Sequence, residues 1–515
     1  MANSDSKLNQ FVYHFVVYFT LAIIGWAILL YLNEGIRLPV WALFGVFLCG
    51  IVVFILAYRH RYRKAINLLR VRFPQITFDK VLKACFVIAI IVGILARLGF
   101  AFIGKPYNPT EPLSDTGIHW EVSRELARGE PMQGDTAMYE AFFPHLMAYS
   151  VTLSLFMRIF GQNLFAILIS NLLFDLVSML CLYLLLRSWK SQRAAMIGSI
   201  IWLINPIEIL YCGVGMSMIV TNTLVLLAIL IAYYAYQFYQ KENLRLFCLF
   251  ACLFGLTVAV GNSFRPIFTV IAIAVVVIFL FNVLSKLKQG FQKSVPAIIG
   301  LVIMFFSSFV GAKFIDFGYQ HLNPYHVPGG TGVGWNFMLG ANYESWGRWN
   351  RTDSARFGEL VYGNDVNPNL VEIQSTFFKE GINRYFAMNP LQFIIHFLHK
   401  TQVFLIDQNN TIAWPFGEAY NVGTDHVLYQ LLHGLGVALF ATLFCLAFFF
   451  LVSSLRANHS YDQTLFFLCL CFCGLVAASL LVEVMWRYVL QAMVVVIILA
   501  ACGISKITAR KETQS

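Results

Sequence analysis

One acidic residue lies where it could take a proton at a membrane surface. Asp115 stands in the run Leu113-Ser-Asp-Thr-Gly-Ile-His-Trp120, which follows an apolar segment at 82–104. A carboxylate held near a low-dielectric boundary can act as a general base when its surroundings adjust its pKa. Asp is also a preferred N-cap residue, so Asp115 could instead only cap the short helix expected over 118–128. We interpret Asp115 as the base, with His119 and Trp120 beside it as substrate contacts.

Three basic residues lie where they could neutralise a departing phosphate. Arg265 and Arg487 each stand at the outer end of an apolar run, and Lys400 lies in the amphipathic stretch 390–405. Fixed cations aimed at developing negative charge are among the strongest catalytic contributions. An interfacial Arg can equally extend to the phosphates of surrounding lipids. We predict that these three cations bind the phosphate of a lipid-linked donor.

A polar stretch rich in Gly, Asn and aromatic residues could hold a sugar. It runs over 334–350 and includes Trp335, Asn336 and Asn342. Binding sites for small polar molecules combine aromatic walls with a few polar groups, which this composition supplies. Trp also gathers in aromatic belts at membrane interfaces, and such a belt explains isolated Trp residues equally well. We assign Trp335, Asn336 and Asn342 to substrate binding.

The sequence indicates no cofactor. His396 and His399 share a helical face at positions i and i+3, but no third ligand has the spacing of a metal site. Neither a Walker motif nor a dinucleotide fingerprint in a strand and helix context occurs. We therefore assign no cofactor with certainty. A divalent metal is compatible with the chemistry but not indicated.

The composition is that of a membrane protein. Hydrophobic residues make up 59% of the chain, charged residues 12%, and 48 residues are Phe. This apolar surface exceeds what one water-soluble core can bury, so the bilayer must be the solvent. The net charge of +10 is explained by basic loops that face anionic membrane lipids, and it is no evidence for nucleic acid binding. We therefore predict an all-α polytopic membrane protein.

Twelve apolar runs approach or exceed the length that crosses a bilayer core of about 30 Å. They span residues 11–32, 39–58, 82–104, 163–187, 193–211, 218–240, 245–261, 267–285, 295–315, 429–452, 463–482 and 486–505. The first run is a full-length span without a convincing small-residue cleavage site, so no cleavable signal peptide is expected.

Basic residues orient these runs. The stretch 59–83 holds eight Lys or Arg, which assigns it to the cytoplasmic side. The run 141–160 would be a thirteenth span, and it would move four later basic clusters outside. We therefore expect 141–160 to be a juxtamembrane or re-entrant helix on the outer side. The alternative is a real span, offset by another miscounted segment.

This map divides the chain into four parts. Residues 1–80 form a two-helix extension with a basic cytoplasmic loop, and residues 81–315 form a catalytic membrane module with a first outer loop at 105–162. Residues 316–428 form an outer region for acceptor and donor binding. Residues 429–515 contain the last membrane helices.

A series of short motifs resembles a known family. Each motif is weak alone, but their order and their positions relative to the spans match over most of residues 82–505. The motifs are Asp115–Trp120, Glu125–Pro131, Phe143–His145, Phe160-Gly161, Asn171-Leu172, Arg187–Arg193, Asn205-Pro206, Arg265-Pro266, Trp335–Asn350, Asn389-Pro390 and Arg487-Tyr488. They resemble bacterial GT-C glycosyltransferases of the protein O-mannosyltransferase and aminoarabinose transferase group.

The resemblance implies a GT-C-like bundle of about 12 transmembrane helices and a sugar transferase, inverting in mechanism. The donor would be a sugar linked to polyprenyl phosphate. The acceptor would be an extracytoplasmic glycan, lipid or protein, such as a cell-envelope polysaccharide or teichoic acid. The enzyme would lie in the bacterial cytoplasmic membrane with its active site facing outside, and Asp115 takes the position of the family's first-loop acid.

The chain departs from the family in two ways. Many members have a second acid at the outer end of a later helix, whereas the corresponding stretch 215–222 offers Asn222, preceded by Glu208 as the nearest carboxylate. We keep Glu208 and Asn222 as candidate substrate contacts. The double proline common in the group after the position of Phe143 is also absent.

Two other functions remain open. A transporter or flippase for a lipid-linked saccharide would share the twelve spans, but it would place charges near the membrane midplane and show repeated halves. Here the polar residues concentrate outside and no half-chain repeat is evident. An oligosaccharide ligase or polymerase would share the outer loops and the Arg residues.

Overall fold

Helices make up the regular structure of this protein. The computed structural model describes residues 2–37, 78–103, 115–287, 290–363, 368–406, 426–456 and 462–509, and these ranges contain no strand. Ten helices within them are long and apolar enough to cross a membrane. The prediction of an all-α polytopic membrane protein is confirmed.

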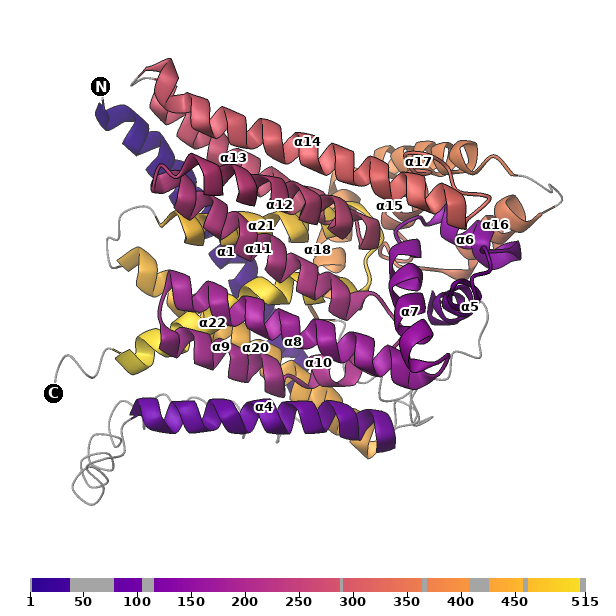
Figure 1. Ribbon diagram of the computed structural model, residues 1–515, viewed down its shortest axis with the longest axis horizontal. Coiled ribbons are helices and arrows are strands. Elements are labelled where there is room, and N and C mark those ends of the chain that lie inside the picture. The colour runs from indigo at the N-terminus through magenta and orange to yellow at the C-terminus, as the bar shows by residue number, and fades with distance from the viewer. Residues whose placement is uncertain are drawn as a thin grey trace.

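The long helices lie alongside one another in a bundle (Figure 1). They are α1 (Ala2–Arg37), α4 (Phe78–Ile103), α8 (Leu164–Trp189), α11 (Met218–Gln240), α12 (Leu244–Phe264), α13 (Phe268–Leu287), α14 (Phe291–Leu322), α20 (Val427–Arg456), α21 (Gln463–Leu481) and α22 (Val489–Ala509). Each corresponds to one of the runs predicted from sequence. The predicted run at 39–58 lies outside the described residues.

The run predicted at 193–211 is interrupted rather than continuous. It consists of α9 (Gln192–Ile204) and α10 (Pro206–Tyr211). Asn205 between them has an extended backbone, and its side chain accepts a hydrogen bond from the Ile207 N–H at 3.2 Å. A residue before proline avoids the helical conformation, while proline suits the first position of a new helix. The Asn-Pro pair therefore ends one helix and starts the next.

Shorter helices gather at one end of the bundle, opposite the start of α1 and the end of α22 (Figure 1). They include α5 (Asp115–Arg128), α6 (Gly134–Phe142), α7 (Met147–Phe160), α15 (Gly334–Gly340), α16 (Arg351–Tyr362) and α17 (Leu370–Ala387), and α18 (Pro390–Ile406) follows them in the chain. The helix predicted over 118–128 is present as α5. The run 141–160 is divided between the end of α6 and α7, and neither helix qualifies as a span.

The short helices α5, α6, α7, α15, α16 and α17, named the outer helices after the side predicted for them from sequence, have a hydrophobic core of their own. Phe142 of α6, Trp335 of α15, Phe357 of α16 and Phe377 of α17 are buried together in one cluster. The Trp335 ring centroid lies 5.0 Å from that of Phe357 and 5.2 Å from that of Phe377. Aromatic pairs at such distances contribute beyond the area they bury. This core fixes the outer helices relative to one another.

Small residues bring α12 and α14 into close contact. A Cβ atom added at Gly255 of α12 would lie 2.0 Å from the Ser307 hydroxyl oxygen, and one added at Gly311 of α14 would lie 2.9 Å from the Ala259 Cβ. Membrane helices associate through such small residues because they let the backbones approach. The two helices therefore run together up to the outer helices.

Candidate active site

Asp115 and Arg487 form an ion pair at the end of the bundle where the short helices gather. Their positions are 372 residues apart in the chain, and the Arg487 Nη2 lies 2.9 Å from the Asp115 Oδ2. Asp115 is the first residue of α5, and Arg487 lies in the 3₁₀ helix η1 (Trp486–Tyr488) directly before α22. The side chains are 24% and 15% exposed. The pair is thus shielded from solvent but can still be reached by a substrate.

A second residue holds the Asp115 carboxylate. The Tyr139 hydroxyl, from α6, donates a hydrogen bond to the Asp115 Oδ1 at 3.0 Å. Burial acts to raise the pKa of Asp115, but the charges of Arg487 and His119 and the bond from Tyr139 outweigh it and hold the pKa below its usual value. Asp115 is therefore ionised at neutral pH.

Arg265 supplies a second cation next to Arg487. It caps the end of α12, and its guanidinium carbon lies 5.0 Å from the ring centroid of Tyr488. The guanidinium carbon of Arg487 lies 5.9 Å from the same ring. Both Nε atoms are buried without a hydrogen-bond partner among the residues that the structure describes. Burial, with the like charge of Arg487 adding to it, lowers the pKa of Arg265. An anion bound between the two guanidiniums would offset their repulsion and accept hydrogen bonds from them.

The segment before Arg487 is tied to the outer region. The Glu483 N–H donates to the Asn336 carbonyl at 2.6 Å, and the Val484 N–H donates to the Gly347 carbonyl at 2.8 Å. The Tyr488 hydroxyl donates to the Glu483 Oε2 at 3.3 Å. Burial raises the pKa of Glu483, although the charge of Arg487 opposes this. Asn336 was predicted as a substrate contact. Its backbone carbonyl positions the segment that leads to Arg487.

Lys400 of α18 binds backbone oxygens. Its Nζ donates to the Gly340 and Val482 carbonyls, each at 2.8 Å, and lies 3.4 Å from the Tyr385 hydroxyl. Burial lowers the pKa of Lys400 to about 7. Lys400 was predicted as a phosphate ligand. In the structure its hydrogen bonds join α15 to the segment before Arg487.

The other first-loop residues have partners of their own. His119 is buried, and its Nδ1 lies 2.9 Å from the Ser150 hydroxyl and 3.6 Å from a carboxylate oxygen of Glu140. It is close enough to Asp115 to contribute to its lowered pKa. Trp120 is half-buried against the main hydrophobic core.

Glu208 and Asn222 form a separate buried pair. The Asn222 Nδ2 donates to the Glu208 Oε1 at 3.2 Å. Glu208 lies in α10, directly after the Asn205 break, and Asn222 lies in the first turns of α11. This hydrogen bond joins the two residues that the sequence analysis kept as candidate substrate contacts.

Two of the predicted sugar contacts, Trp335 and Asn342, have partners within the protein. Trp335 is 6% exposed, within the core of the outer helices. The Asn342 Nδ2 donates to the Asp353 Oδ2 at 2.9 Å, and Arg384 forms an ion pair with Asp353 at 2.7 Å. These contacts favour a role in holding the outer region.

Sequence reasoning missed Tyr139 and Glu483, and it used Tyr488 only as part of a motif. Tyr139 lies in a helix whose periodicity does not indicate which residue faces Asp115. Glu483 had a weak signal, since it is a carboxylate four residues before Arg487 at the end of an apolar run.

Metal ligands do not converge at this site or elsewhere in the described ranges, where no group of three His, Cys, Asp or Glu side chains could hold a metal ion. The arrangement offers instead one ionised carboxylate beside two guanidiniums with unfilled donors. Such a set can accept a proton on one side and bind a phosphate on the other.

Comparison with known proteins places part of the chain in context. No match was found among curated proteins. Among solved structures, the chain is similar to an archaeal oligosaccharyltransferase, AglB from Archaeoglobus fulgidus, with a TM-score of 0.45 and 15% identity over 84% of this chain. The similarity spans 51% of the length of that protein. Residues 144–310 match the family model of dolichyl-phosphate-mannose-protein mannosyltransferases. The resemblance to GT-C glycosyltransferases drawn from the sequence motifs is thereby confirmed over these residues.

Proposed function

We propose that this protein is a membrane glycosyltransferase. It moves a sugar from a polyprenyl-phosphate carrier to a hydroxyl group of an extracytoplasmic acceptor, which is a cell-envelope glycan, lipid or protein. The observation that carries the proposal is the meeting of Asp115 with Arg487 and, through the Tyr488 ring, with Arg265. The family model of mannosyltransferases that use a dolichyl-phosphate sugar supports it.

Asp115 acts as the general base in this proposal. Its carboxylate takes the proton of the acceptor hydroxyl while the oxygen attacks the anomeric carbon of the sugar from the face opposite the phosphate. The bond between the anomeric carbon and the phosphate oxygen breaks, and the electron pair leaves with polyprenyl phosphate. Arg265 and Arg487 stabilise the charge that appears on this phosphate. A single displacement of this kind inverts the anomeric centre.

The ion pair between Asp115 and Arg487 gives donor binding a second effect. A phosphate that binds Arg487 competes with Asp115 for the same guanidinium. When Arg487 turns to the phosphate, Asp115 loses the charge that lowers its pKa most, while its burial still acts to raise the pKa. Asp115 then becomes a stronger base. Donor binding therefore prepares the base for the acceptor.

The active site faces outside in this proposal, because basic clusters of the loops lie at the other end of the helices on the map derived from sequence. Lys190 and Lys241 at the ends of α8 and α11 belong to that basic end. The outer helices and the Asp115 cluster, which consists of Asp115, Arg265, Arg487 and Tyr488, then meet acceptors in the cell envelope. The enzyme would lie in the bacterial cytoplasmic membrane.

The experiment that tests the function is mass spectrometry of envelope glycans and prenyl-phosphate sugars from cells that lack this chain. We expect one envelope component to lose a sugar and the prenyl-phosphate sugar to accumulate. Wild-type chain should restore the sugar, and an Asp115→Asn variant of equal abundance should not. Unchanged glycans in the deletion strain, or full restoration by Asp115→Asn, would contradict the proposal.

A further inference from the structure

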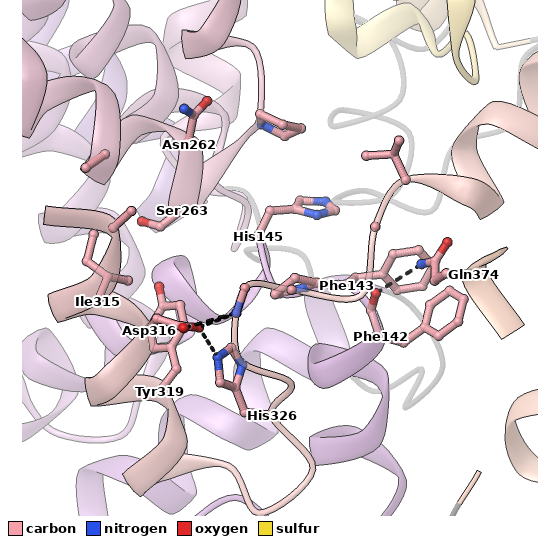
Figure 2. Close-up of a pocket in the computed structure, with 18 of the residues that line it drawn as sticks. Phe142, Phe143, His145, Asn262, Ser263, Ile315, Asp316, Tyr319, His326 and Gln374 are labelled. Carbon is pink, nitrogen blue, oxygen red and sulfur yellow. Dashed lines mark hydrogen bonds and ion pairs between the residues drawn. The ribbon is translucent and has the colours of Figure 1, made fainter. Parts of the chain in front are cut away.

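A cavity lies next to the Asp115 cluster and is not explained by donor binding. It has a volume of about 340 Å³ and is lined by residues of α12 and α14, by the loop 326–333, and by residues from α15 and from the turn before α7. Figure 2 shows Asn262, Ser263, Asp316 and Tyr319 on one side of it and Phe142 and Gln374 on the other. Ligand sites usually begin at about 300 Å³, so this volume suits a small head group rather than a stretch of polymer.

One wall of the cavity adjoins the proposed catalytic groups. His145 lines the cavity (Figure 2). The charges of Arg265 and Asp115 both act on its pKa, which burial and Arg265 together lower to about 4. His145 is therefore neutral and can exchange hydrogen bonds with a hydroxyl group. Pro266, directly after Arg265, also lines the cavity. Phe143 of the lining packs against Tyr139 with ring centroids 4.8 Å apart, and the Tyr139 hydroxyl donates to Asp115. A group bound here would therefore have one end near Asp115.

The opposite wall belongs to helices that face lipid. Ala259 of α12 and Ala312 and Lys313 of α14 line the cavity. On the same segment of α14, Phe309, Phe314 and Phe317 are 62%, 77% and 60% exposed. Exposed Phe residues on a membrane helix contact acyl chains. The cavity thus adjoins a surface covered by lipid, so an amphiphile can enter it from the bilayer.

Lys313 gives this entrance a positive charge. Its side chain is exposed. Among the residues that the structure describes, no carboxylate forms an ion pair with it. Lysine binds phosphate as a point charge. The wall near Lys313 therefore suits the phosphate of a lipid head group.

The outer wall is held in place by one carboxylate. Asp316 accepts hydrogen bonds from the His326 Nε2 at 2.6 Å and from the Gly329 N–H at 3.0 Å (Figure 2). Gly329 has a φ of +81°, which favours glycine. These contacts fold the loop back onto α14, so the cavity is preformed and needs little ordering when a ligand binds.

From this placement we propose that the cavity binds the acceptor, and that the acceptor is a membrane lipid with an anionic head group that carries a free hydroxyl. The lipid enters from the lipid-covered side of α14, with its phosphate at Lys313 and its hydroxyl near His145 and Asp115. In the transfer, this hydroxyl oxygen forms the bond to the sugar, its proton goes to Asp115, and polyprenyl phosphate leaves. The proposal rests on the proposed function and names the class of its acceptor.

The test is photo-crosslinking of the full chain in phosphatidylcholine vesicles that contain a photoactivatable phosphatidylglycerol. This probe has an anionic phosphate and free hydroxyls, whereas phosphatidylcholine has no free hydroxyl and no net charge. We expect peptides that contain residues 259–266 and 312–319 to be labelled. Unlabelled phosphatidylglycerol should compete for this labelling, and additional phosphatidylcholine should not.

Two variants examine the cavity itself. Ala312→Phe fills it and should abolish the labelling, while the matched variant Val310→Phe, which adds a ring to the same helix outside the lining residues, should leave it unchanged. Lys313→Ala removes only the charge, and it should weaken labelling about fivefold, as expected for one lysine at an anionic lipid surface. Equal labelling in wild type, Ala312→Phe and Lys313→Ala would overturn the proposal.

The donor is followed separately with fluorescent decaprenyl phosphate. Ala312→Phe should leave its binding unchanged, and Arg487→Ala should weaken it. If decaprenyl phosphate displaces the photoactivatable lipid, or if Ala312→Phe abolishes decaprenyl phosphate binding, the cavity serves the donor chain and the lipid-acceptor proposal is wrong. If instead a soluble oligosaccharide competes for the labelling, the acceptor is not a lipid. Unchanged decaprenyl phosphate binding in Arg487→Ala would contradict the proposed function alone.

Discussion

Replacing Asp115 with Asn separates proton transfer from every other role of this residue. Asn keeps the shape of the side chain. Its carbonyl oxygen can accept from Arg487, which lies 2.9 Å from the Asp115 Oδ2, and its NH2 group can donate to the hydroxyl oxygen of Tyr139, which lies 3.0 Å from the Asp115 Oδ1. Each bond loses its charged acceptor, which costs about 1 kcal/mol per bond. The folded protein should therefore survive, with a loss of about 2 kcal/mol. Transfer should fall by roughly 10² to 10⁴, the usual contribution of a general base.

Binding of the donor phosphate should change in the opposite direction. In the wild type, a phosphate must replace Asp115 at Arg487. This competition is removed when residue 115 is neutral. An ion pair of this exposure contributes about 1 kcal/mol, so decaprenyl phosphate should bind up to about fivefold more tightly to Asp115→Asn. A purely structural role for Asp115 would instead make binding and transfer fall together.

The assay measures both quantities on purified protein in vesicles. Binding is followed by fluorescent decaprenyl phosphate, and transfer is followed by release of decaprenyl phosphate from the sugar-linked donor that accumulates in the deletion strain. Asp353→Asn is the matched control, because Asp353 also lies in the first turn of an outer helix and pairs with Arg384 at 2.7 Å. It should lose stability but keep transfer. Near-normal transfer by a well-folded Asp115→Asn variant would refute the reasoning.

Three further predictions follow from the same contacts. Arg265→Ala and Arg487→Ala should each weaken decaprenyl phosphate binding about 10- to 100-fold, the range for one charge-assisted hydrogen bond. Lys at either position should restore this binding only partly because it lacks the planar guanidinium. Unchanged binding in both Ala variants would remove the two residues from the site. Lys400 has a folded-state pKa of about 7 against an ordinary value of 10.5, so between these values the unfolded chain binds more protons than the folded protein. The free energy of unfolding of the wild type should therefore rise with pH over this window relative to that of Lys400→Met. Parallel curves of apparent unfolding temperature against pH for the two proteins would contradict this. Cysteines introduced at positions 135 and 350 should react with an impermeant thiol reagent in intact cells, whereas those at 190 and 241 should not, and labelling at 190 from outside would overturn the orientation.

Much of the architecture could be predicted because length and hydropathy report directly on membrane helices. The break after Ile204 also had a signal, since Asn205-Pro206 is a turn-forming pair inside an apolar run. The two cations Arg265 and Arg487 were selected because each lies at an outer helix end, and such ends converge when helices form one bundle.

Other features of the site could not be predicted from the chain. The bond from Tyr139 to Asp115 depends on how α6 folds back over α5, which periodicity does not report. Trp335 was assigned to sugar binding, but composition cannot distinguish an aromatic residue on a surface from one in a small core such as that of the outer helices. Lys400 was assigned to phosphate from its place in an amphipathic stretch, and its three oxygen partners could not be foreseen because they belong to residues distant in the chain.

The close contact between Gly340 and the segment before Arg487 limits how such a protein can be recombined. A Cβ atom at position 340 would lie 2.4 Å from the carbonyl carbon of Val482, and one at position 347 would lie 2.8 Å from the Lys400 side chain. At position 340 the obstacle is backbone, so only glycine fits unless the backbone moves, and at position 347 a φ of +74° favours glycine as well. A chimera that exchanges residues 316–406 with those of a relative, in order to change the acceptor, must therefore also exchange residues 481–488. Otherwise the new outer region would displace Arg487 and disable the site that it was meant to redirect.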